Sequence, residues 1–157
     1  MTERTISINY QEYGSIEELN EEDRELARAA VQAMGRAYAP YSHFHVGAAV
    51  RLSDGTIVPG ANQENAAYPS GLCAERTAMF AASAAYPDLD MVSIAVAGGA
   101  SGLLDHIPAT PCGACRQVMA QYQHKSGKPM SILLVAAKQV LKFEKVDDIL
   151  PFIFKSI

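Results

Sequence analysis

The sequence predicts an α/β domain in which helices pack on a mixed β-sheet. Segments with helical periodicity alternate with short apolar runs of strand length. Their order is helix, hairpin, helix, strand, helix, strand, strand, which is typical of layered α/β folds. The 157 residues suit a single domain with a full core. We therefore expect one domain over 1–157, with 1–18 as a peripheral N-terminal extension.

The first helix is predicted to begin after Asn20 and to end before Pro40. Asn20 is a favoured N-cap residue, and the acidic residues after it suit the positive end of the helix dipole. Apolar residues then recur at spacings of three and four, and Pro40 stops the helix. Ahead of this helix, the alternation of Ile6, Ser7 and Ile8 predicts at most a short edge strand.

A hairpin and a second helix follow. Asp54-Gly55 between two β-type runs predicts a hairpin with strands over 44–52 and 56–61. The helix over 73–85 is so rich in alanine and other apolar residues that we expect it to be buried on most sides. The later predicted elements are a strand over 91–97, a glycine-rich loop over 98–109, a helix over 112–124, strands over 130–137 and 138–144, and a short helix over 146–150.

Composition and charge exclude several classes of function. The formal net charge is −4, so the chain lacks the basic excess of proteins that bind nucleic acid. No segment approaches the roughly 20 apolar residues of a membrane helix. The polar start contains no apolar core of a secretory signal. We expect a cytoplasmic protein with no nucleic-acid or membrane partner.

All three cysteines lie in two short motifs, Cys73-Ala74-Glu75-Arg76 and Pro111-Cys112-Gly113-Ala114-Cys115-Arg116. An odd number of cysteines argues against a disulfide framework, and reduced thiolates bind metal. Two of them, Cys73 and Cys112, begin predicted helices, where the helix dipole lowers thiol pKa values. Cys112 and Cys115 lie one helical turn apart and can face one point. The pattern predicts a zinc site with three thiolate ligands.

The fourth position of this zinc site decides its chemistry. Structural zinc sites are closed by four protein ligands, whereas catalytic ones keep a position for water. The remaining candidates are His43, His45, His106 and His124, and none has ligand spacing to a cysteine. We therefore favour an open, catalytic site.

Two residues beside Cys73 are predicted to support that chemistry. Glu75 would act as a proton shuttle, although a glutamate in a first helical turn also suits the helix dipole by itself. Three thiolates on Zn²⁺ carry net negative charge, so positive groups must surround them for a bound water to ionise. Arg76 and Arg116 are the candidates to hydrogen-bond the sulfurs, and we expect Arg76 to contribute most.

At these motifs the sequence resembles the zinc-dependent cytidine deaminases, in which C-A-E-R is followed at a distance by P-C-x-x-C. The resemblance runs from about residue 38 to residue 154 and includes the segments 41–49, 62–66 and 150–154. It implies a three-layer α/β/α sandwich with a five-stranded mixed sheet. The ligand set is similar to that of the small homotetrameric class, with one Zn²⁺ per chain.

The resemblance also implies a role for each pocket residue. Glu75 would take a proton from a water on the zinc and pass protons to N3 and to the leaving amine. The Thr110 carbonyl would hold the departing ammonia. The implied substrate contacts are Asn62 and Glu64 on the ribose 3′-hydroxyl, Phe44 on the pyrimidine ring, Ala74 and Tyr68 at the rim, and Phe154 in a neighbouring subunit's site. For Phe152 we expect core packing instead.

The resulting hypothesis is hydrolytic deamination of cytidine and 2′-deoxycytidine to uridine and 2′-deoxyuridine, a reaction of pyrimidine salvage. A deaminase of another cytosine compound, such as a nucleoside antibiotic, is an alternative that Asn62 and Glu64 disfavour. A zinc-stabilised binding protein is a second alternative, which predicts a closed site and no use for Glu75. The sequence departs from the resemblance in residues 1–18 and in the loop 98–108, away from the zinc motifs.

Overall fold

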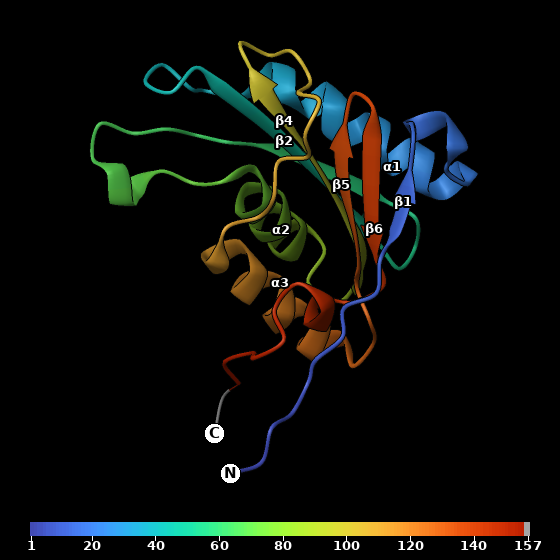
Figure 1. Ribbon diagram of the computed structural model, residues 1–157. Helices are drawn as coiled ribbons and strands as arrows, with labels where there is room; N and C mark the ends of the chain where they lie inside the picture. Colours follow the sequence, from blue (N-terminus) through green and yellow to red (C-terminus); the bar gives the residue numbers. More distant parts are fainter. Residues whose placement is uncertain (156–157) are drawn as a thin grey trace.

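The computed structural model describes residues 1–155 and shows a six-stranded sheet between two layers of helix (Figure 1). The strand order is β1-β6-β5-β4-β2-β3, with β4 and β5 parallel and all other neighbours antiparallel. The strands are β1 (Gln11–Tyr13), β2 (Phe44–Leu52), β3 (Ile57–Ala61), β4 (Met91–Ala100), β5 (Ser131–Ala136) and β6 (Gln139–Phe143). The helices are α1 (Glu21–Ala33), α2 (Ala74–Ala85) and α3 (Gly113–Ser126), with short 3₁₀ turns that include η2 (Met34–Arg36) and η4 (Val146–Asp148). The predicted α/β/α layers are confirmed.

The expected number of five strands is wrong, because the N-terminal extension adds a sixth. Residues 11–13 pair antiparallel with β6 at the edge of the sheet. The aromatic ring of Tyr10 lies 5.5 Å from that of Phe143, which anchors the extension beside β6. The proposed edge strand at Ile6–Ile8 is absent from the described residues, where 1–10 are all exposed and form no strand.

Alternating side chains along the central strands form two separate cores. In β4, Ile94 and Val96 pack with α2 and α3, while Ala95 and Ala97 pack with α1. The same division holds along β2 and β5, because successive strand residues point to opposite faces. The two cores identify α1 as one outer layer and α2 with α3 as the other.

Two boundaries differ from the prediction. The α-helical part of α1 ends at Ala33, well before Pro40, and continues as the 3₁₀ turn η2. Strand β4 runs on to Ala100, so part of the expected glycine-rich loop is strand. A Cβ on Gly99 would lie 1.7 Å from the Leu103 carbonyl oxygen, so only glycine lets the following loop fold back onto β4.

Two predicted burials are wrong. Helix α2 is buried on one face only, and Phe80 on its outer face is 42% exposed. Phe152 is 83% exposed instead of lying in the core. Ile153 takes the inward position in the extended tail and packs on the core beneath α2 and α3. Phe152 and Phe154, on either side of Ile153, are both largely exposed.

Gly60 fixes how closely α2 approaches β3. A Cβ at this position would lie 2.4 Å from the Ala78 backbone nitrogen and 2.8 Å from the Ala74 carbonyl oxygen. We expect Gly60→Ala to cost about 1–3 kcal/mol through overpacking. A melting temperature lowered by roughly 2–4 °C per kcal/mol should report the loss. Gly35→Ala is the matched control, because nothing lies within 4 Å of its added Cβ. Equal stability of the two variants would contradict this account.

Candidate active site

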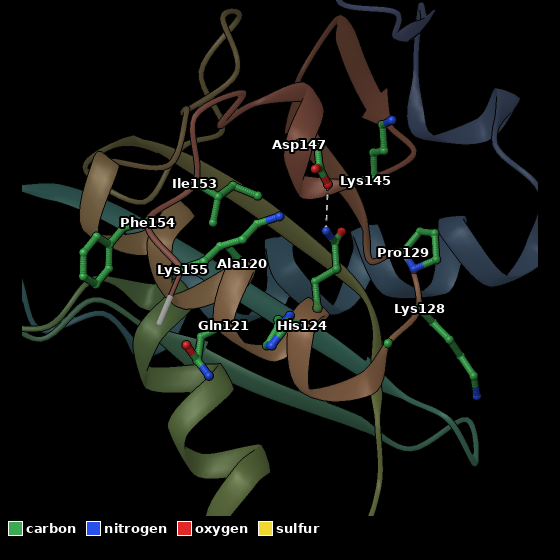
Figure 2. Close-up of a pocket in the computed structure, with 12 residues that line it drawn as sticks. Ala120, Gln121, His124, Lys128, Pro129, Lys145, Asp147, Ile153, Phe154 and Lys155 are labelled. Atoms are coloured by element: carbon green, nitrogen blue, oxygen red, sulfur yellow. Dashed lines mark hydrogen bonds between the residues drawn. The ribbon is translucent and has the colours of Figure 1, made fainter. Parts of the chain in front are cut away.

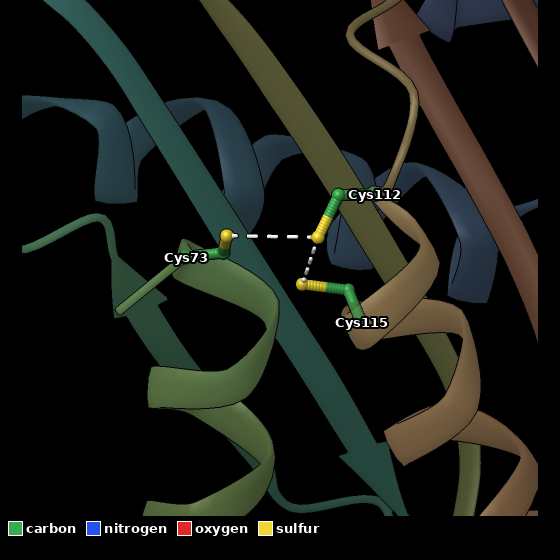
Figure 3. A group of neighbouring side chains, drawn as sticks. All are labelled: Cys73, Cys112 and Cys115. Carbon is green, nitrogen blue, oxygen red and sulfur yellow. Dashed lines mark hydrogen bonds between the residues drawn. The ribbon is translucent and has the colours of Figure 1, made fainter. Parts of the chain in front are cut away.

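The three cysteines meet where α2 and α3 begin (Figure 3). Cys73 is the N-cap residue of α2, Cys112 is that of α3, and Cys115 lies in the first turn of α3. The Sγ atoms of Cys73 and Cys112 are 3.9 Å apart, and those of Cys112 and Cys115 are 3.5 Å apart. All three cysteines are free, and Cys115 is buried. Two helix N-termini therefore direct their positive ends toward one cluster of sulfur atoms.

This cluster fits a tetrahedral zinc ion. Zn–S bonds of about 2.3 Å place two sulfurs of a tetrahedron about 3.8 Å apart, close to the observed separations. The cluster in residues 1–155 that can hold a metal contains the three cysteines and none of the four histidines. The donor set thus provides three ligands and leaves the fourth position to a non-protein ligand, as in catalytic zinc sites.

Hydrogen bonds and charges around the sulfur cluster favour the thiolate form of Cys73. Hydrogen bonding from Cys115, then from Arg76 and Cys112, lowers the pKa of Cys73 to about 5. The pKa of Cys115 is raised because its thiol donates to the Cys73 thiolate. Arg76 Nη2 donates to Cys73 Sγ at 3.7 Å. Arg116 does not share this task, since its guanidinium donates to the carbonyls of Pro111 (2.8 Å) and Ile149 (2.7 Å).

Glu75 is a buried carboxylate next to the sulfur cluster. Its exposed fraction is 4%, and it lines the same cavity as Cys73 and Cys112. Burial raises the pKa of Glu75, and the negative charge of Cys73 raises it further. A carboxyl group with a raised pKa is suited to exchange protons near neutral pH.

A cavity of about 660 Å³ opens beside the sulfur cluster, within the size range of small-ligand sites. Its lining contains the predicted pocket residues Phe44, Asn62, Glu64, Tyr68, Ala74 and Thr110. The lining combines sulfur atoms and a buried carboxylate with the polar groups of the 62–65 segment. A ligand that fills it would contact both.

Asn62 and Glu64 reach this cavity because the chain between them is extended. Gln63 exchanges backbone hydrogen bonds with Leu72, both 2.9 Å, and the Glu64 N–H donates to the Tyr38 carbonyl at 2.8 Å. In such a segment residues two apart share a face. Asn62 is held further by strand β2: its Oδ1 accepts from the Val46 N–H (2.8 Å) and its Nδ2 donates to the Phe44 carbonyl (2.9 Å).

Comparison with known proteins identifies the family. The model of the cytidine and deoxycytidylate deaminase zinc-binding region matches residues 20–127. The chain belongs to this family. A cytidine deaminase of Halalkalibacterium halodurans is 49% identical over 98 residues, which cover 61% of the chain and 68% of the relative. One of Sporosarcina psychrophila is 41% identical over 123 residues, covering 78% and 84%.

Solved structures agree with this family. The crystal structure of cytidine deaminase from Burkholderia pseudomallei has a TM-score of 0.68 and 40% identity, covering 83% of this chain and 97% of that one. That of Mycobacterium tuberculosis has a TM-score of 0.66 and 31% identity, covering 84% and 96%. Together, the family's zinc-binding region and the three-cysteine cluster identify zinc as the cofactor.

Phe154 lies apart from the deaminase-type cavity of its own chain. It is 79% exposed, and its carbonyl accepts from Gln117 Nε2 at 2.8 Å. It borders a smaller hollow of about 270 Å³ between the C-terminal half of α3 and the tail (Figure 2). There Asp147 accepts from Gln123 at 2.8 Å, which ties η4 to α3. This hollow contains none of the cysteines.

Two cavity residues had been given no role from the sequence. Tyr41 and Ser42 precede Phe44 and line the cavity, and both donate hydrogen bonds to Glu64. The only hint in the sequence was that Ser42, which carries a hydroxyl, lies two positions before Phe44. Its partner lies 22 positions further along the chain, so only the fold shows the pairing.

Among the described residues, no helix is long and apolar enough to cross a membrane.

Proposed function

We propose that this protein deaminates cytidine and 2′-deoxycytidine hydrolytically to uridine and 2′-deoxyuridine, releasing ammonia. One observation carries the proposal: two of the three convergent thiols, those of Cys73 and Cys112, and the buried Glu75 line a nucleoside-sized cavity together with Asn62 and Glu64. A zinc-stabilised binding protein would have no need of a buried carboxylate beside an incomplete ligand set.

Each group near the sulfur cluster has a proposed task. Cys73, Cys112 and Cys115 would hold zinc, which when bound activates water for attack on C4 of cytosine. Glu75 takes one proton from the attacking water and gives it to the ring nitrogen N3, and it then passes the second proton of that water to the leaving amine. Arg76 offsets the negative charge of the thiolates through its bond to Cys73.

The other end of the cavity binds the nucleoside. Phe44 packs on the pyrimidine ring, the Thr110 carbonyl accepts from the departing ammonia, and Ala74 and Tyr68 border the opening. In this proposed arrangement the amino group of the base would face the sulfur cluster and the sugar would face the 62–64 segment.

Hydrogen-bond capacity suits this segment to a single sugar hydroxyl. One N–H of the Asn62 amide remains after its bond to the Phe44 carbonyl. The Glu64 carboxylate accepts three hydrogen bonds from Tyr41 and Ser42, which leaves about one of its roughly four lone-pair positions. One donor and one acceptor match a hydroxyl, which both donates and accepts. The 3′-hydroxyl is common to cytidine and 2′-deoxycytidine, so we expect weak discrimination between them.

Oligomeric state and location are part of the same proposal. The exposed Phe154 and Phe152 suit contact with another copy of the chain, and we propose a homotetramer whose sites lie at subunit interfaces. Sedimentation equilibrium should give four times the chain mass. Three free thiols that serve as metal ligands favour a reducing compartment, so we propose a cytoplasmic enzyme.

Direct turnover tests the activity. Zinc-loaded protein incubated with cytidine should shift the ultraviolet spectrum to that of uridine and release one ammonia per nucleoside. No spectral change at any zinc loading would overturn the proposed function. Turnover of a cytosine compound that lacks a sugar, at equal efficiency, would contradict the role of Asn62 and Glu64.

Glu64→Ala should mainly weaken nucleoside binding. Loss of a charged hydrogen bond to the sugar should raise KM for cytidine roughly 10- to 100-fold, with a smaller change in kcat. Asp54→Ala is the matched control, since Asp54 accepts from Thr56 in an exposed turn at the other end of β2. Unchanged KM in Glu64→Ala would show that the carboxylate does not bind the sugar.

A further inference from the structure

The hydroxyl of Ser42 joins the two parts of the cavity that bind sugar and base. Its Oγ donates to Glu64 Oε1 and accepts from the Phe44 N–H at 3.0 Å. His43 is the single residue between Ser42 and Phe44 in the chain. A single side chain thus contacts the proposed sugar-binding carboxylate and the backbone of the proposed base-packing aromatic.

Ser42 supplies the contact that holds the second oxygen of Glu64. The backbone N–H groups of Tyr41 (2.9 Å) and Ser42 (3.3 Å) both donate to Oε2. Within residues 1–155, the protein group that donates to Oε1 is the Ser42 hydroxyl. These bonds, the Ser42 hydroxyl first and the Tyr41 N–H next, hold the pKa of Glu64 below its ordinary value. With both oxygens held, the carboxylate keeps one orientation at the wall of the cavity that it lines.

The backbone of this turn is held in an unusual conformation. His43 has a φ of 55°, in the left-handed region that non-glycine residues seldom adopt. Its N–H donates to the Ala39 carbonyl (3.1 Å), and its carbonyl accepts from the Ser101 N–H (2.8 Å). Such conformations persist where surrounding contacts hold them, and they concentrate at functional sites. Here the reversal brings the Phe44 N–H within reach of Ser42 Oγ.

We propose that Ser42 is a positioning residue, whose hydroxyl orients the Glu64 carboxylate toward the sugar hydroxyl of the substrate. The proposal rests on the proposed deaminase function and adds a determinant of sugar recognition to it. Ser42 has no proposed contact with the reacting atoms, so its effect should appear in substrate binding and not in proton transfer.

Steady-state kinetics of Ser42→Ala test the proposal. KM for cytidine should rise about three- to tenfold, the effect of one neutral hydrogen bond, while kcat changes less than about twofold. Ser42→Thr keeps the hydroxyl and should restore most of the affinity. Thr56→Ala is the matched control, because it removes a hydroxyl that donates to a carboxylate in the distant hairpin turn. Its KM should equal that of the parent protein.

Two comparisons test whether Ser42→Ala raises KM through Glu64. The nucleoside 3′-deoxycytidine lacks the 3′-hydroxyl that Glu64 is proposed to bind. With this substrate, Ser42→Ala should change KM less than about twofold. In a double-mutant cycle, Ser42→Ala should add little to Glu64→Ala, since coupled residues are non-additive. An equal loss with both nucleosides, or full additivity, would overturn the proposal while the parent protein still turns over cytidine. No turnover by the parent protein would overturn the proposed function and this inference together.

Discussion

Glu75→Gln should keep about one zinc ion per chain and lose nearly all cytidine turnover. Glutamine preserves the size of the buried side chain but can neither accept nor return a proton at that oxygen. General acid–base catalysis contributes about 10²- to 10⁴-fold to rate, and a loss of that order in kcat is expected. The measurement pairs zinc content by elemental analysis with turnover followed by ultraviolet absorbance.

Glu22→Gln is the control for this substitution. Glu22 is the second residue of α1, as Glu75 is of α2, so both suit the positive end of a helix dipole. Glu22 is exposed and lies outside the cavity. If Glu75 served only the dipole, the two variants would show the same small loss of stability and normal turnover. Retained turnover in Glu75→Gln would therefore eliminate the proton shuttle.

Cys112→Ser should abolish zinc binding and, with it, activity. A serine hydroxyl stays protonated near neutral pH and is a poor zinc ligand, so two thiolates would remain where three are needed. The folded chain also loses the stabilisation that a bound ion provides, about 4 kcal/mol when the ion is present at about a thousand times its dissociation constant. Since about 1 kcal/mol shifts Tm by roughly 2–4 °C in a domain of this size, Tm should fall by on the order of 10 °C.

A chelator supplies the internal comparison for Cys112→Ser. Removing zinc from the parent protein should lower its Tm to about that of the variant, and adding zinc back should restore Tm and turnover in the parent alone. The Glu75→Gln protein should respond to chelator as the parent does, because its ligands are intact. Full zinc content in Cys112→Ser would show that Cys112 is not a ligand.

The order of elements and the zinc motifs were accessible from sequence because both depend on local spacing. The Asn20 cap is as predicted: its side chain accepts from the Asp23 N–H at 2.9 Å. The spacing of Cys112 and Cys115 places both on one turn of α3, and the hairpin around Asp54-Gly55 is formed. These features need only neighbouring residues, and the alternation of side chains in the strands follows from the same local rule.

Contacts between segments that lie far apart in the sequence could not be predicted from local spacing. The sequence did not show that Gln11–Tyr13 of the N-terminal extension forms an edge strand, because that pairing depends on the edge that β6 leaves free. Helix α2 was expected to be buried on most sides, but Phe80 lies on the face that points away from the sheet and is 42% exposed. Arg116 sits beside a ligand in sequence, yet its guanidinium reaches Ile149 in place of the sulfurs.

For this protein the sequence alone pointed to the three cysteines as candidate zinc ligands, to the carboxylate beside them and to the layered α/β fold. These follow from residue type and from spacing within one helical turn or one strand. Only the tertiary structure decided that two helix N-termini bring Cys73 within 3.9 Å of Cys112, and that Ser42 meets Glu64. Those pairs lie 39 and 22 positions apart in the chain. No local rule sets their distance, because it depends on how α2, α3 and β2 pack on a shared sheet.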